Sequence, residues 1–271
     1  AGMCKTKRED YEKYWDSISP FIKFGCLKDE KFCDKMKDAV LFKDIDGKYL
    51  TLKDCVEANG GELKELDKNA APDNAEENAE EKKTTIYYVT DEIQQSQYIN
   101  MFRAQGQDAV VLKHNIDSPF ITQLEQRYQN VQFQRIDADV TDNAKEEVAE
   151  DEKEAFQKTV DSLTATFRKE LGNDKLDVKV EKLKDSNVAS IMTLSEQSRR
   201  MQEMMKMYGM SGMDPSMFGT NATLILNANH PLVEYVVAHK DGENTEMFCH
   251  QLYDLAMLAH KPLSPEEMTE F

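Results

Sequence analysis

Methionine is the residue type whose placement in this chain most strongly indicates a chemical role. Seven of the fourteen methionines fall between residues 201 and 217, in the stretch MQEMMKMYGMSGMDPSM that follows Arg199 and Arg200. A methionine side chain is unbranched and polarizable, so a cluster of them forms a surface that adapts to many apolar shapes. The chemistry predicted for this stretch is weak, unselective binding of apolar groups.

Two other interpretations of the same stretch stay open. Met201, Met204, Met205 and Tyr208 follow helical spacing, and an apolar helical stripe is usually buried in its own domain. Thioethers are also soft ligands for copper, although no histidine or cysteine stands nearby in the sequence. Against complete burial, the methionines are too widely spread for one narrow stripe and continue past Gly209, where regular helix is not expected.

No residue pattern typical of catalysis is found in the sequence. It holds no glycine-rich phosphate loop, no G-x-S-x-G elbow and no H-E-x-x-H zinc motif. The histidines, which lack the spacing of a zinc triad, are His114, His230, His239, His250 and His260. We therefore predict no catalytic, metal-binding or cofactor-binding residues. Two non-enzymatic classes remain, a binding protein with an adaptable apolar surface and an oligomeric scaffold.

Composition restricts the partners and the compartment. A net charge of -17 over 271 residues argues against binding to a phosphate backbone, and the longest apolar runs are too short to span a bilayer. The five cysteines are scattered and include no C-x-x-C pair, which is typical of free thiols in a reducing compartment. We predict no nucleic-acid or membrane partner and a cytoplasmic location.

The elements in the first half of the chain change character near residue 85. Helices are predicted within residues 9–58, and a polar, repetitive segment follows at 60–83. Three short β-rich runs then alternate with helical stretches, and they are 86–89, 109–112 and 131–136. This order predicts a three-stranded parallel β-α-β-α-β unit over residues 85–136.

The second half is predicted to be an α+β domain. Residues 137–154 hold nine acidic residues against two lysines, so we place the boundary there, between domains 1–140 and 141–271. Helices and strands follow in mixed order, with strands predicted at 176–180, 188–194 and 223–226 and helices at 231–239 and 245–259. Ser264 begins a further helix that the chain leaves unfinished, so we expect a fragment of a longer protein.

Four stretches of the sequence carry a family resemblance in combination. They are EDYEKYWDSISPFIKFG at 9–25, TIYYVT at 85–90, NIDSPF at 115–120 and LNANHPL at 226–232. Together they resemble successive landmarks of the heat-shock protein 90 chaperones, the bacterial members above all, over nearly the whole chain. The resemblance implies that 1–140 is the later part of the middle domain and 141–271 most of the C-terminal client-binding and dimerisation domain.

The resemblance implies that this chain is part of an ATP-driven dimeric clamp that assists protein folding under stress. The full-length parent would be an ATPase that uses ATP and Mg. This chain holds neither the family's ATP-binding domain nor the arginine segment that reaches the ATP phosphate, so no cofactor and no ATP hydrolysis are expected here. The implied partners are non-native client proteins and a second copy of the chain.

The resemblance also implies particular contact residues. By position, the predicted client-binding residues are Met201, Met204, Met205, Gln197 and Phe120, with Pro119 beside Phe120 as the alternative aromatic position. The predicted dimerisation residues are Phe248, Leu252, Leu255, Ala256 and Ala259. Because the last helix is cut short, a weakened dimer is expected. The alternatives are a purely structural dimerisation scaffold and, less favoured, a nucleotide-binding α/β enzyme.

Overall fold

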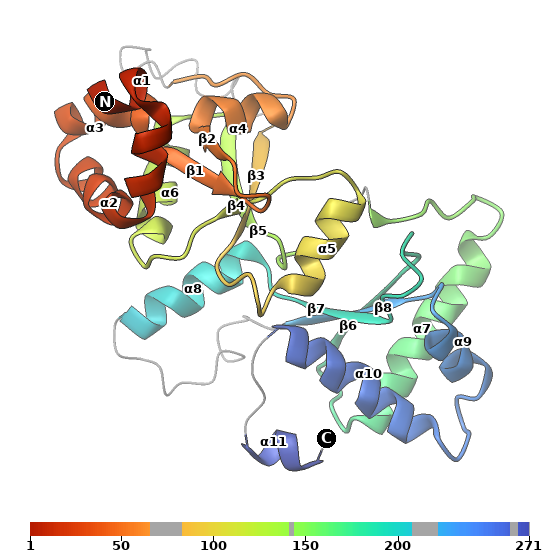
Figure 1. The fold of residues 1–271 in the computed structure, drawn as a ribbon. Coiled ribbons are helices and arrows are strands. Elements are labelled where there is room, and N and C mark those ends of the chain that lie inside the picture. Colours follow the sequence, from red (N-terminus) through yellow and green to blue (C-terminus); the bar gives the residue numbers. More distant parts are fainter. Residues whose placement is uncertain (66–82, 141–143, 208–221, 261–264, 271) are drawn as a thin grey trace, which may run out of the picture. The chain divides into compact units, whose positions relative to one another are not determined.

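A computed structural model gives the fold and describes residues 1–65, 83–140, 144–207, 222–260 and 265–270 (Figure 1). Side chains at 202–207, 266, 267 and 270 lie outside that description. The chain divides into two units, one of residues 1–92 and 107–135 and the other of residues 93–106 and 136–271. No helix in the described part is both long and apolar enough to cross a membrane.

Unit 1 combines helices with one mixed sheet. Its helices are α1 (Gly2–Thr6), α2 (Arg8–Lys28), α3 (Glu30–Met36), the 3-10 helix η1 (Lys37–Ala39), α4 (Leu52–Ala58) and α6 (Asp117–Arg127). Its strands are β1 (Leu41–Asp44), β2 (Tyr49–Thr51), β3 (Thr84–Val89), β4 (Val110–Val111) and β5 (Val131–Arg135). A capping box opens α4, because Thr51 and Asp54 satisfy each other's backbone N–H groups.

The five strands are ordered β2-β1-β4-β3-β5. β3 is parallel to both β4 and β5, whereas β1 runs antiparallel to β4 and to β2. The β1-β2 hairpin was not predicted, and its turn includes Asp46 and Gly47. Asp44 holds that turn by accepting hydrogen bonds from the N–H groups of Asp46 and Lys48, and Gly47 supplies the left-handed backbone at φ +87°.

Helix α2 packs against the core of unit 1 through a face that includes a charged side chain. Tyr14 is exposed, whereas the buried residues of the helix are Tyr11, Trp15, Ser19, Lys23 and Cys26. Lys23 is tolerated inside because its ammonium group pairs with the buried carboxylate of Asp117. That partner lies 94 residues further along the chain, so helical periodicity gave no signal of it.

Unit 2 is built from helices and a smaller sheet. Its helices are α5 (Ser96–Ala104), α7 (Lys153–Glu170), α8 (Glu196–Met207), α9 (Pro231–Ala238), α10 (Thr245–His260) and α11 (Pro265–Glu270). Its strands are β6 (Asp177–Glu181), β7 (Ser190–Thr193) and β8 (Thr223–Asn227), in the order β6-β8-β7. β8 is parallel to β6 and antiparallel to β7, so this sheet too is mixed.

The core of unit 2 lies between this sheet and the helices α7, α9 and α10. Leu163 and Phe167 of α7 are fully buried against Leu224 of β8 and Leu252 of α10. Helix α5 also belongs to this unit, and the hydroxyl of its Tyr98 donates a 2.6 Å hydrogen bond to the carbonyl of Met192. Sequence order alone had placed this helix inside the β-α-β-α-β unit of residues 85–136.

The stretch LNANHPL is a structural connector between β8 and α9. The buried Asn227 side chain donates to the carbonyls of Asp185 and Val188 and accepts from the N–H of Leu183. His230 then caps α9, because its Nδ1 atom accepts the N–H of Leu232 at 3.2 Å. This stretch therefore has a structural role, because the hydrogen-bonding groups of the Asn227 side chain are used within the fold and are not offered to a ligand.

Candidate functional site

The amino-terminal turns of α8 carry the described part of the predicted client-binding site. Ser195 precedes the helix, and its Oγ atom accepts the N–H of Ser198 at 3.2 Å, as an N-cap residue does. Glu196 follows in the first turn, where a carboxylate is favoured by the helix dipole. Figure 1 shows α8 as one continuous helix that follows β7.

Met201 and Gln197 are both exposed on this helix. They are four residues apart, so they lie on one face, and Met201 is 38% exposed. Met204 and Met205 belong to the same helix, but their side chains lie outside the described part, as do the side chains of Met207 to Met217. An exposed face with at least one methionine and one amide is therefore established at the start of α8.

The two arginines that precede Met201 differ in exposure. Arg199 is only 4% exposed. Its guanidinium is held by Glu196, at 2.5 Å from Nη2 to Oε1, and Arg200 donates to the same carboxylate at 2.8 Å. The two arginines thus anchor the first turn of α8, and only Arg200 is partly exposed beside the face.

Phe120 is not an exposed aromatic residue, and the prediction for it is wrong. It is 1% exposed and packs in the core of unit 1, where the ammonium of Lys23 lies 5.8 Å from its ring centroid. The third position after the start of α6 faces inward because Phe120, Ile121 and Leu124 form the buried side of that helix. Pro119, the alternative, is exposed.

The predicted dimerisation residues lie on two different sides of α10. Leu252 and Ala256 are fully buried in the core of their own unit, and this corrects their assignment to an interface. Phe248 is half-buried and packs edge-on against Tyr235 of α9, with 4.9 Å between the ring centroids. Leu255 is 48% exposed, whereas Ala259 is half-buried.

Other exposed apolar side chains were missed by the sequence analysis. On α10, Met247 is exposed, and it lies two helical turns before Leu255 on the same side of the helix. On α2, the exposed side chains Tyr14, Phe21 and Phe24 recur at intervals of seven and three residues. Helical spacing alone does not show which aromatic residues of α2 face outward, whereas the packing of Tyr11 and Trp15 in the core does.

The chemistry that these surfaces support is apolar contact. Among the residues that the structure describes, no group of three or more histidine, cysteine, aspartate or glutamate side chains is arranged to hold a metal ion. Met201 and Leu255 present flexible aliphatic or thioether groups, which repack against many shapes without fixed hydrogen bonds. Such groups favour binding to extended apolar polypeptide or to another apolar helix.

Comparison with known proteins agrees with this description. The model of the Hsp90 protein family matches residues 3–271. The "Chaperone protein htpG" of Bacteroides fragilis (strain YCH46) is 31% identical over 250 residues, which covers 89% of this chain and 34% of the relative. The protein of the same name from Bacteroides thetaiotaomicron is 29% identical over 92% of this chain, and that from Porphyromonas gingivalis (strain ATCC 33277) is 28% identical over 87%.

The matches cover nearly all of this chain but only part of each relative. The chain spans about a third of the length of these curated relatives, while nearly all of the chain is covered. A family match over residues 3–271 includes both units and every landmark stretch noted in the sequence. This chain therefore belongs to the Hsp90 protein family.

Proposed function

We propose that this chain is the client-holding part of a molecular chaperone and binds non-native polypeptides through the exposed face of α8. The observation that carries the proposal is the exposure of Met201 and Gln197 on a helix that continues into Met204 and Met205. Membership of a family whose relatives are named chaperone proteins supports it. An exposed apolar side chain beside further methionines in the sequence is typical of a surface that binds another molecule.

The strength of such binding suits a chaperone. Full burial of one methionine side chain contributes about 1.5–3 kcal/mol, so a face of three methionines yields weak, reversible attachment once the cost of ordering the client is included. Methionine makes no directional contacts that would select one sequence. The proposed partners are therefore unfolded segments of many proteins, recognised by exposed apolar side chains.

The proposal extends to the assembly of the whole protein. We propose a homodimer in which α10 contributes Leu255 and Met247, the two exposed apolar residues on its outer side. The full-length protein would couple client binding to ATP and Mg, whereas this chain alone is proposed to bind no cofactor. Calorimetric titration with ATP and with NAD checks the last point, because micromolar binding of either would favour the nucleotide-binding enzyme instead.

The test of client binding is the replacement of Met201, Met204 and Met205 together by serine. We expect the variant to lose most of its ability to suppress light scattering by a heat-denatured client enzyme, because the polar hydroxyl groups remove the apolar face. The Met201→Ser single variant is expected to lose part of it. Circular dichroism of each variant verifies that the helix content is unchanged, since serine lowers helix propensity by only a few tenths of a kcal/mol.

A matched control separates this face from general surface polarity. Met3 and Met268 are exposed methionines outside α8, and their replacement by serine is expected to leave suppression unchanged. Equal suppression by the folded α8 triple variant and the unsubstituted chain would contradict the proposal. It would favour a dimerisation scaffold, in which the methionines of α8 pack internally.

A further inference from the structure

The outer side of helix α2 carries six exposed residues in a regular pattern. Successive members are separated by four, three, four, three and four residues, which is the spacing of the positions that meet a partner helix in a coiled coil. We call these residues the α2 stripe, and they are Asp10, Tyr14, Ser17, Phe21, Phe24 and Lys28. The opposite side of the helix packs in the core of unit 1, so the stripe faces away from that core.

The aromatic side chains of the α2 stripe are unusually exposed. Phe21 is 76% exposed, Tyr14 is 59% exposed and Phe24 is 53% exposed. Among the residues that the structure describes, the only other exposed aromatic side chain is Phe32, in the first turn of α3. A row of exposed aromatic residues in a chain with a net charge of -17 indicates a surface that meets another apolar surface.

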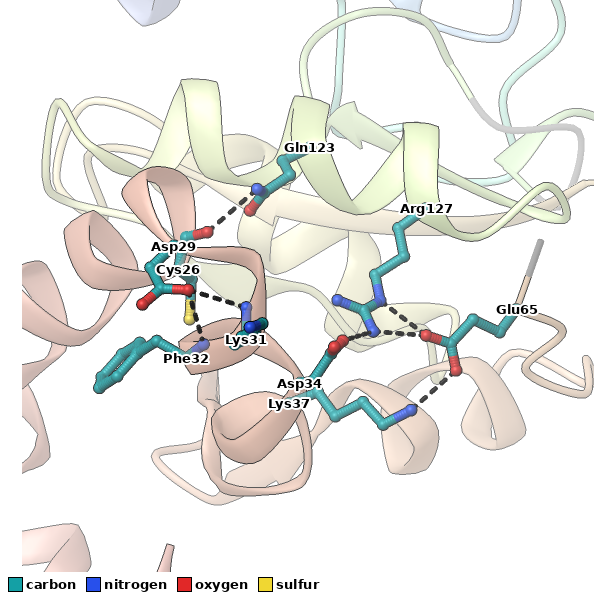
Figure 2. Close-up of polar contacts among 9 residues, drawn as sticks. All are labelled: Cys26, Asp29, Lys31, Phe32, Asp34, Lys37, Glu65, Gln123 and Arg127. Atoms are coloured by element: carbon teal, nitrogen blue, oxygen red, sulfur yellow. Dashed lines mark hydrogen bonds and ion pairs between the residues drawn. The ribbon is translucent and has the colours of Figure 1, made fainter. Parts of the chain in front are cut away.

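The last turn of α2 is held in place by the neighbouring helices. Asp29 caps α3 by accepting the N–H groups of Lys31 at 2.9 Å and Phe32 at 3.2 Å (Figure 2). The amide of Gln123, on α6, donates a 3.1 Å hydrogen bond to the carbonyl of Cys26 in α2. These contacts fix the end of the helix that carries Phe24 and Lys28.

A second set of contacts fixes α3 against α6. The guanidinium of Arg127, on α6, binds Asp34 of α3, and its Nε atom lies 2.8 Å from Glu65. Lys37 binds the other carboxylate oxygen of Glu65 at 2.7 Å (Figure 2). The corner of α2 and α3 is therefore ordered before any partner arrives, which lowers the entropy cost of association.

The α2 stripe is complementary to the same stripe of a second copy in the antiparallel direction. When two α2 helices lie antiparallel with Ser19 at the centre, each residue of one stripe faces a residue of the other stripe. Ser19 itself is buried on the opposite side of the helix, so it marks only the level of the two-fold axis. The facing pairs are Asp10 with Lys28, Tyr14 with Phe24, and Ser17 with Phe21.

Opposite charges meet at both ends of this antiparallel pair. Asp10 of one copy faces Lys28 of the other, and the two-fold axis repeats this pair at the far end. Within its own chain Asp10 contacts Lys13 at 3.3 Å, but such an exposed pair is weak and leaves the second carboxylate oxygen for a partner. A parallel pair in register would instead place Asp10 against Asp10 and Lys28 against Lys28, where like charges repel.

The middle of the antiparallel pair is matched in shape. Tyr14 faces Phe24, and two aromatic rings attract each other when they meet edge to face or offset. Ser17 is small and faces Phe21, the most exposed ring of the stripe, so the ring enters the space that the serine leaves. Charge and shape thus select the same direction and the same register.

We propose that two copies of this chain associate through their α2 stripes, as an antiparallel pair with its two-fold axis at the level of Ser19. Six residues are few beside the about 20–30 residues that each partner contributes to a stable interface, so the association is weak and reversible. The stripe lies in unit 1, whereas α8 and α10 lie in unit 2. Failure of the client-binding proposal or of the α10 contact therefore leaves this proposal intact.

The test uses the whole chain with Leu255→Glu, which removes the proposed α10 contact. Sedimentation velocity over a concentration series is expected to show a reversible dimer, and addition of Phe21→Ser is expected to raise its dissociation constant about tenfold or more. Ile93→Ser, at an 89% exposed residue of unit 2, is the matched control and is expected to leave the constant unchanged. Fluorescence of the buried Trp15 verifies that α2 stays folded in each variant. A dimer that Phe21→Ser leaves unchanged, or a chain that stays monomeric at every concentration, would overturn the proposal.

Charge reversal tests the antiparallel register, again in the Leu255→Glu chain. Asp10→Lys makes both ends of the stripe positive and Lys28→Asp makes both ends negative, so each variant alone is expected to lose self-association. An equimolar mixture of the two variants is expected to regain it, because opposite charges then meet at both ends. A mixture that associates no better than either variant alone would overturn the register.

The Phe21→Ser variant also distinguishes a second copy from a non-native client as the occupant of the stripe. Its suppression of light scattering by a heat-denatured client enzyme is expected to equal that of the unsubstituted chain, because the proposed client site lies on α8. Loss of suppression together with unchanged self-association would assign the stripe to client polypeptide and overturn the pairing.

Discussion

Buried polar side chains connect distant parts of each unit. In unit 1 the carboxylate of Asp117 receives the ammonium of Lys23 and the N–H of His114. In unit 2 the side chain of Asn227 joins four backbone groups, the N–H groups of Leu183 and Asn229 and the carbonyls of Asp185 and Val188. Both residues lie in stretches that carry the family resemblance, at 115–120 and 226–232, and the family model matches residues 3–271. These stretches are explained by their part in the fold, since each polar atom is satisfied within its own unit.

At the scale of the residue, replacement of Lys23 by methionine tests how much the buried pair of Lys23 and Asp117 contributes to stability. The change leaves the carboxylate of Asp117 buried without its cation, so the free energy of unfolding of unit 1 is expected to fall by about 3–5 kcal/mol. The single tryptophan of the chain, Trp15, is buried in the same helix, and its fluorescence during urea denaturation reports this unit. Lys13→Met removes an exposed pair with Asp10 and serves as the control, with an expected change below about 1 kcal/mol. Equal midpoints for the two variants would show that the buried pair contributes little.

At the scale of the element, sequence patterns predicted where helices and strands lie better than they predicted which side of a helix is buried. The runs 86–89 and 223–226 fall within the strands β3 (Thr84–Val89) and β8 (Thr223–Asn227), because short β-branched and aromatic runs between turn signals are typical of strands. The hairpin of β1 and β2 was missed, since its first strand directly follows an apolar helical pattern. The burial of Lys23 on α2 was not predicted, because it depends on a partner that only the tertiary fold supplies.

The same distinction holds for the candidate sites. The sequence placed Leu252, Leu255 and Ala256 together at an interface, but residues three and four apart on α10 divide between the core and the surface. Leu252 packs in the hydrophobic core of its own unit, and Leu255 is not part of that core. Periodicity predicts which residues share a face of a helix, but it does not predict whether that face meets the core or a partner.

Helix α10 therefore provides the element-scale prediction for dimerisation. Leu255→Glu places a charge on its exposed side, so we expect the dimer dissociation constant of the chain to rise by about tenfold or more, measured by sedimentation velocity over a concentration series. Leu232→Glu, on the exposed side of α9, is the control and is expected to have no effect. An unchanged sedimentation profile for Leu255→Glu would place the interface elsewhere.

On the scale of the whole molecule, an acidic chain with two separate units presents its apolar groups in small patches. The net charge of -17 keeps the unbound chain dispersed, and the exposed methionine of α8 lies in the second unit, whereas the exposed aromatic row of α2 lies in the first. The chain spans about a third of its chaperone relatives, so the cycle of the complete protein is a proposal about that larger molecule. The resemblance predicted the family that the match over residues 3–271 shows.

The most direct test of the central claim is photo-cross-linking from the exposed position of Gln197. A benzophenone amino acid placed there is expected to cross-link to a reduced and alkylated protein that cannot refold, and not to the same protein in its native state. The same group at the exposed Glu234 of α9 is the matched control and is expected to give only background. Cross-linking of the unfolded client from position 197 no stronger than from position 234 would contradict client binding by α8.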